Sequence, residues 1–120
     1  MTQAASQASK FYEEVVASRS VFTLLDDGDF LVFPIKGLDV VPFWSTASRI
    51  ARVQKNHPRY RPFACDKIEL EAFLERTLPD LKVEGIHVGV NWSGPRLTGY
   101  DISVPDLVKN LSYWQARAKL

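Results

Sequence analysis

The stretch GIHVGVNWSG, residues 85–94, is the most informative part of the sequence. Apolar side chains alternate with small or polar ones along it, which is the period of a half-buried β-strand. The face expected to meet the core carries Ile86, Val88, Val90 and Trp92. The opposite face carries His87, Gly89 and Asn91, and a glycine inside a strand often marks close approach by a ligand or by another part of the chain.

This second face has two interpretations. In the first it is the floor of a pocket, where Asn91 makes hydrogen bonds and His87 donates a proton. In the second it meets solvent, or a helix packs tightly over Gly89, which is the more common arrangement and needs no ligand. Replacing Gly89 by valine distinguishes the two interpretations. We expect the loss of stability that follows if a helix packs closely over Gly89.

The strand continues into a loop, Asn91–Arg96, that combines an aromatic ring, a hydroxyl and a guanidinium. Binding groups often gather on loops at strand ends, and arginine is a planar, bidentate donor for anions. Trp92, Ser93 and Arg96 therefore predict a clamp for an anion or a peptide. The alternative is a plain Gly-Pro turn beside a tryptophan that completes the core.

A similar junction, Pro42–Ser45, leads from a short strand into a helix. Ser45 or Thr46 can cap that helix, and its free N–H groups can hold an anion with Arg49 one turn further on. Ordinary capping and a core position for Trp44 are the alternative.

The two junctions together predict one crevice. If the strand ends are neighbours, Trp44 and Trp92 form two of its walls, and we expect both tryptophans and Arg96 to converge on one surface. Further polar candidates around this crevice are His87, Asn91, Ser93, Tyr100 and Asp101. Asp101 is the only suitable base among them, unless it pairs with Arg96 as a structural salt bridge.

The rest of the chain supplies further helices and strands. Helices are expected from Ala8 to Ser18–Ser20, from Ser45 or Thr46 to about Asn56, over Leu70–Leu81 with a break near Pro79, and after a capping box at Ser103 and Asp106. Strands are expected at 21–25, 30–35, 40–43, 63–68, 86–92 and 100–103, with Pro34 at an edge or a bulge. This irregular order predicts a single α+β domain, residues 1–120 with 1–7 frayed. Its mixed or antiparallel sheet has about five to six strands and about four covering helices.

Composition restricts the class of protein and its partners. The 120 residues are 46% hydrophobic and 24% charged, as in an ordinary globular domain. The net charge of +1 produces no electrostatic field that would attract the protein to nucleic acid or to an anionic membrane. The basic stretch 46–67 is typical of a solvated surface, so nucleic acid is not an expected partner. One cysteine, no signal-peptide pattern and no apolar run near the ~20 residues of a membrane span favour a cytoplasmic protein.

Catalytic and metal-binding patterns are sparse. His57 and His87 do not lie at metal-ligand spacing with Cys65. A single cysteine on a strand is typically a small buried apolar residue. We therefore predict no catalytic residue, no metal and no cofactor.

Four runs carry a resemblance to a known family: KFYEEVVASRSVFTLLDDG from Lys10, VVPFWSTASRIARV, LEAFLERTLPDL, and VGVNWSGPRLTGYDI. Over about Lys10–Leu111 the chain resembles a bacterial domain-of-unknown-function family (DUF2750-like). In the order of its hairpin, its P-F-W-S turn and its N-x-x-G turn it is also similar to SseB-type N-terminal domains. The resemblance implies a fold and a small bacterial protein, and it brings no activity or site residue.

Two functions follow as hypotheses. The first is a non-enzymatic protein-interaction module of accessory or immunity type, because 12% of the residues are aromatic and aromatic residues are enriched at interfaces. Its partner is another protein or a second copy, and Tyr113 and Trp114 of the last helix are candidates for contact. The alternative is a protein, or an enzyme, that binds a small molecule or anion in the crevice between Trp44-Ser45 and Asn91–Arg96.

Overall fold

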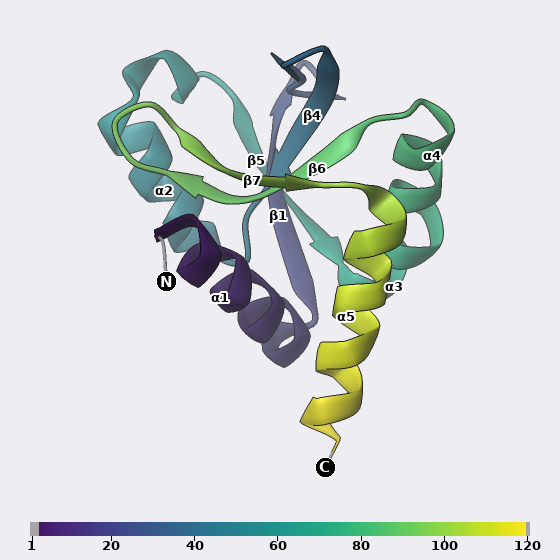
Figure 1. Ribbon diagram of the computed structural model, residues 1–120. Coiled ribbons are helices and arrows are strands. Elements are labelled where there is room, and N and C mark those ends of the chain that lie inside the picture. The colour runs from purple at the N-terminus through teal and green to yellow at the C-terminus, as the bar shows by residue number, and fades with distance from the viewer. Residues whose placement is uncertain (1–2, 120) are drawn as a thin grey trace.

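The computed structural model describes residues 3–119, in which two small β-sheets share the centre of the molecule and helices cover them (Figure 1). The strands are β1 (Ser20–Asp26), β2 (Asp29–Phe30), β3 (Phe33–Ile35), β4 (Leu38–Phe43), β5 (Ala64–Glu69), β6 (His87–Ser93) and β7 (Thr98–Ile102). One sheet has the order β2-β1-β5 and the other β3-β4-β6-β7. Strands β4 and β6 run parallel, and the other pairs are antiparallel. The predicted α+β class is confirmed, with two sheets instead of one.

The helices are α1 (Gln3–Ser18), α2 (Ala47–Asn56), α3 (Leu70–Ala72), α4 (Leu78–Val83) and α5 (Val104–Ala118), with a 3₁₀ turn η1 (Pro58–Tyr60) and a π-helical turn η2 (Phe73–Thr77). The Oγ of Ser103 accepts a hydrogen bond from the backbone N–H of Asp106 and caps α5, as predicted. Helix α1 begins at Gln3 and not at Ala8, so residues 3–7, expected to fray, are helical. Alanine and glutamine are good helix formers, which accounts for the longer helix. Residues 1–2, also expected to fray, lie outside the described residues.

The π turn explains why Pro79 does not end its helix. We expected a break near Pro79, but α3, η2 and α4 follow one another without interruption from Leu70 to Val83. Proline lacks an N–H, and its ring collides with the carbonyl four residues earlier, here that of Glu75. The wider π turn at Phe73–Thr77 makes room for the proline ring at this carbonyl, so the helical segment continues through Pro79.

The predicted strand at 30–35 is divided between the two sheets. Phe30 pairs with Leu25 in the first sheet, whereas Phe33 pairs with Val40 in the second, because the chain crosses from one sheet to the other between them. Pro34 lies on the edge strand β3, as expected for a residue without an N–H. Cys65 was expected to be buried, but it is exposed, because its strand β5 is also at a sheet edge.

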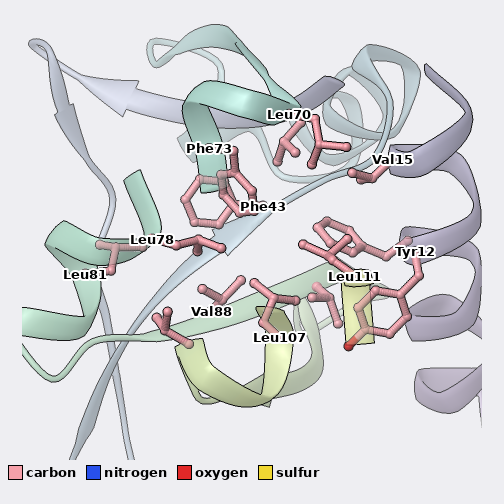
Figure 2. Packing of buried hydrophobic residues seen from close by; sticks show 14 of the residues in the cluster. Tyr12, Val15, Phe43, Leu70, Phe73, Leu78, Leu81, Val88, Leu107 and Leu111 are labelled. Atoms are coloured by element: carbon pink, nitrogen blue, oxygen red, sulfur yellow. The ribbon is translucent and has the colours of Figure 1, made fainter. Parts of the chain in front are cut away.

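The larger apolar core lies between α1, α5, the helical segment Leu70–Val83 and the sheets (Figure 2). The ring of Phe43 meets that of Phe73 edge-on, with 5.0 Å between ring centroids. Tyr12 and Leu111, from opposite ends of the chain, belong to this same core (Figure 2). Burial of this core therefore fixes both terminal helices against the sheets.

A second, smaller core lies beneath α2, and it corrects the prediction for strand β6. Val88 and Val90 belong to the larger core, whereas Trp92 belongs to the smaller one, on the other face. The cause is a β-bulge at Asn91, whose φ is +51° and where the pairing with β7 shifts between Val90 and Ser93. An extra residue in a strand reverses the alternation beyond it, so Trp92 turns to the face of Gly89.

Candidate functional site

The two junctions found in the sequence are neighbours in space. Because β4 and β6 are parallel and Phe43 is paired with Val90, both strands end at the same edge of the sheet. The indole Nε1 of Trp44 donates to the backbone carbonyl of Trp92 at 2.9 Å. Both rings are almost fully buried, at 1% and 2% exposure. The tryptophans therefore meet, as expected, but as part of the core and not as open walls.

Asn91 holds the two strand ends together. Its Oδ1 accepts from the backbone N–H of Ser45 at 2.9 Å, and its Nδ2 donates to the Oγ of Ser45 at 3.0 Å and to the carbonyl of Gln7 at 3.3 Å. The side chain is 1% exposed, and asparagine tolerates a positive φ better than most residues. The bulge and these hydrogen bonds therefore depend on the same residue.

The start of α2, where the sequence suggested an anion site, is capped by side chains of the protein itself. Asn91 occupies the N–H of Ser45, and the Oγ1 of Thr46 accepts from the N–H of Arg49 at 3.2 Å. Thr46 is thus the capping residue. Two of the backbone donors at this junction, those of Ser45 and Arg49, are thus used within the protein.

An ion pair joins α1 to α2 beside this cap. The Oε1 of Glu14 accepts from the Nε of Arg49 at 3.0 Å, lies 2.9 Å from its Nη2, and accepts from the hydroxyl of Ser45 at 2.6 Å. Burial favours the neutral acid, but hydrogen bonds from Arg49 and Ser45 outweigh it and lower the pKa of Glu14 below its ordinary value. Glu14 therefore carries a charge that neutralises Arg49.

A cavity of about 220 Å³ opens between α2 and the end of β6. Its lining residues are Gln7, Trp44, Arg49, Arg52, Val53, Asn56, His57, Asn91, Trp92, Ser93 and Gly94. The Nε2 of His57 lies 2.9 Å from the carbonyl oxygen of Gly94, and Gln7 donates to the hydroxyl of Ser93. We call this space the α2 cavity. Five of the candidates from the sequence line it: Trp44, Arg49, Asn91, Trp92 and Ser93. Ser45 does not line it but is hydrogen-bonded to Asn91.

The remaining candidates, His87, Arg96, Tyr100 and Asp101, do not line the α2 cavity. Arg96 is exposed, one residue before the buried Leu97 of the smaller core. Asp101 pairs with His87 and not with Arg96: the Oδ2 of Asp101 lies 3.1 Å from the Nδ1 of His87. His87 and Asp101 are diagonal neighbours on β6 and β7, which explains the pairing.

The space above Gly89 is filled by neither a ligand nor a helix. A Cβ atom on Gly89 would lie 2.5 Å from Cε2 of Trp92, and one on Gly99 would lie 2.6 Å from Cδ1 of the same ring. The indole therefore lies over both glycines, and its Nε1 donates to the carbonyl of Tyr100 at 2.9 Å. At Gly89 the expected close packing is therefore found, with the indole of Trp92 in the place expected for a helix.

A second cavity, of about 480 Å³, lies between α1, β7 and α5, and we call it the α1/α5 groove. Figure 1 shows both helices on the same side of β6 and β7. The groove is lined by Ala5, Ala8, Ser9, Tyr12, Val90, Tyr100, Asp101, Ile102, Asn110, Tyr113 and Trp114. Tyr100 and Tyr113 are 47% and 57% exposed. Aromatic residues from three elements thus surround one opening.

The aromatic side chains of the α1/α5 groove are held in place. The ring of Trp114 stacks on that of Tyr12, with centroids 6.3 Å apart, and Asn110 donates to the hydroxyl of Tyr12 at 3.0 Å. Burial raises the pKa of Tyr12, although this hydrogen bond lowers it in part. Arg117 lies over the ring of Tyr113 and donates to its hydroxyl at 2.9 Å. Sequence reasoning missed Tyr12 and Asn110, because only the helix pairing brings them together.

Neither a metal site nor a membrane-spanning helix is found in the part of the chain that the structure describes. Among residues 3–119 no group of three or more His, Cys, Asp or Glu side chains is arranged to hold a metal ion. Within the same range no helix is long and apolar enough to cross a bilayer.

The mixed sheets, terminal helices and bulged central strand define a small α+β domain. Residues 8–111 match the family model described as "Protein of unknown function (DUF2750)", and the chain belongs to this family. The family resemblance seen in the sequence is thereby confirmed. No curated protein matches the chain.

Proposed function

We propose that the protein is a bacterial, cytoplasmic, non-enzymatic interaction module, of accessory or immunity type, and that a partner protein binds in the α1/α5 groove. The observation that supports this most is the half-exposed Tyr100 and Tyr113, which surround the groove together with the partly buried Trp114. Interfaces are enriched in such residues, because large rigid rings bury much apolar area at little cost in entropy.

The edge strand β7 indicates how a partner can bind. It lies at the end of its sheet, and within residues 3–119 only β6 pairs with it. An extended segment that adds to such an edge gains backbone hydrogen bonds, while its alternate side chains enter adjacent pockets. We therefore infer that the partner presents an extended segment whose apolar side chain enters between Tyr100 and Tyr113.

The alternative, an enzyme acting at one crevice, has less support. Its only candidate base, Asp101, is engaged with His87 and lies away from the α2 cavity. Arg96, the expected anion clamp, is also outside that cavity. The candidate groups are therefore not placed around one reacting atom.

Selection from a library of displayed random peptides tests the proposal. Selected peptides are expected to bind the parent protein and to lose at least tenfold in affinity for Tyr113→Ser, as measured by fluorescence anisotropy. The matched control is Val108→Ser, because Val108 lies on the same helix and does not line the groove. Failure to enrich any peptide, or equal binding to Tyr113→Ser, would overturn the proposal.

Sedimentation measurements distinguish another protein from a second copy as the partner. A dimer that forms with rising concentration and is lost in Tyr113→Ser identifies a second copy in the groove. A monomer at all concentrations, together with selected peptides, identifies another protein.

A further inference from the structure

We infer that the α2 cavity is a binding site for a small organic carboxylate with a short apolar body. It shares no lining residue with the α1/α5 groove, so this inference stands apart from the proposed function. At about 220 Å³ the cavity is smaller than the 300–1,000 Å³ typical of drug-sized ligands, which restricts it to a small molecule.

The charges around the cavity favour an anion. Arg49, Arg52 and Asn56 are spaced three and four residues apart, so they lie along one face of α2, and all of them line the cavity. Among the described residues that line the cavity, none is acidic. The lining therefore contributes positive charge and hydrogen-bond donors, with no carboxylate to repel an anion.

One guanidinium is left for a ligand. Glu14 neutralises Arg49 from outside the cavity lining, whereas Arg52 has no acidic partner among residues 3–119. A single unpaired guanidinium matches one negative charge, and its planar fork matches the two oxygens of a carboxylate. This arrangement favours a monoanion over a doubly charged phosphate.

The other part of the lining is apolar. Trp44, Trp92 and Val53 line the cavity with the 1–4% of their surface that the smaller core leaves exposed. This narrow apolar part of the lining complements a short hydrocarbon chain, which a purely polar anion such as phosphate lacks. The combination of a donor face and an apolar wall therefore specifies an organic carboxylate.

The site is organised before a ligand arrives. His57, at the end of α2, is hydrogen-bonded to the Gly94 carbonyl at 2.9 Å, and Gln7 of α1 donates to Ser93. These contacts hold the turn after β6 against both helices. Binding therefore does not have to order this loop, which would otherwise weaken affinity.

Titration of ¹⁵N-labelled protein with butyrate, acetate and inorganic phosphate tests the inference. Butyrate is expected to bind most tightly, in the millimolar range, and to shift the backbone amide signals of Gly94 and His57. Acetate is expected to bind more weakly because it lacks the longer hydrocarbon, and phosphate more weakly still. Equal binding of phosphate and butyrate, or no saturable shift with any probe, would overturn the inference.

Three substitutions test whether the charge of Arg52 is responsible for binding. Arg52→Gln is expected to weaken butyrate at least tenfold, whereas Arg59→Gln, an exposed arginine just after α2 that does not line the cavity, leaves affinity unchanged. Asn56→Asp keeps the shape but adds a negative charge to the lining, and is expected to abolish binding. Equal losses for Arg52→Gln and Arg59→Gln would indicate diffuse attraction and refute a built site.

Discussion

Replacing Gly89 by valine is expected to destabilise the protein by overpacking the site beneath Trp92. The new Cβ would lie 2.5 Å from Cε2 and 2.7 Å from Cζ2 and Nε1 of the indole. The ring cannot move aside freely, because its Nε1 is hydrogen-bonded to the Tyr100 carbonyl and its edge contacts Phe33 at 5.5 Å between centroids. The substitution therefore places atoms where rigid, buried groups already lie.

The magnitude follows from three contributions. Overpacking a core costs about 1–3 kcal/mol, and displacing the indole from its hydrogen bond costs about 1 kcal/mol more. The higher strand preference of valine offsets up to about 1 kcal/mol. We expect a net loss of about 1–4 kcal/mol in the free energy of unfolding, which lowers Tm by roughly 4 °C for each kcal/mol in a domain of this size.

Denaturant melts of Gly89→Val measure this loss as a lower midpoint at an unchanged slope. A matched variant identifies the cause: Trp92→Phe replaces the indole, whose Cε2, Cζ2 and Nε1 the new Cβ would meet, by a smaller ring. In the Trp92→Phe background, Gly89→Val is expected to cost at least 1 kcal/mol less than in the parent. An unshifted midpoint for Gly89→Val would refute the packing account and make His87 and Asn91 the first residues to test for function.

Three further predictions concern single side chains. Arg96→Ala is expected to change stability by less than about 0.5 kcal/mol in a thermal melt, because Arg96 is exposed; a large loss would show a structural partner. Because the folded-state pKa of Glu14 lies below the ordinary 4.5, the stability that Glu14 contributes is present above pH 4.5 and is lost as the pH falls through the folded pKa. The difference in Tm between the parent and Glu14→Gln should therefore narrow on acidification, and a difference that does not change with pH contradicts the ion pair with Arg49. Partial desolvation of the exposed Cys65 thiol and the charge of Asp66 raise the pKa of Cys65 above 9.0, so iodoacetamide should modify Cys65 more slowly at neutral pH than it modifies a model thiol, as followed by mass spectrometry. Modification at the rate of the model thiol would contradict this environment.

Local signals in the sequence predicted much of the fold. The alternation around Val88 and Val90 identified the central strand, and the capping residue Ser103 marked the start of the last helix. These features depend on residues close together in the chain, where the period of a strand and the chemistry of a cap are directly visible. The proximity of the Trp44 and Trp92 junctions also followed from their positions at strand ends.

Contacts between distant residues decided the rest. Asn91 has a positive φ and is held by hydrogen bonds to Ser45, which lies 46 positions earlier in the chain. The bulge at Asn91 turns Trp92 to the opposite face of the strand. No local pattern shows such a bulge, and one extra residue is enough to reverse a period of two. The α1/α5 groove likewise exists only because Tyr12 and Trp114, from opposite ends of the chain, stack on each other. The sequence by itself determined the class of fold and the neighbouring strand ends, whereas tertiary packing decided which side chains face a cavity, because that depends on partners far apart in the chain.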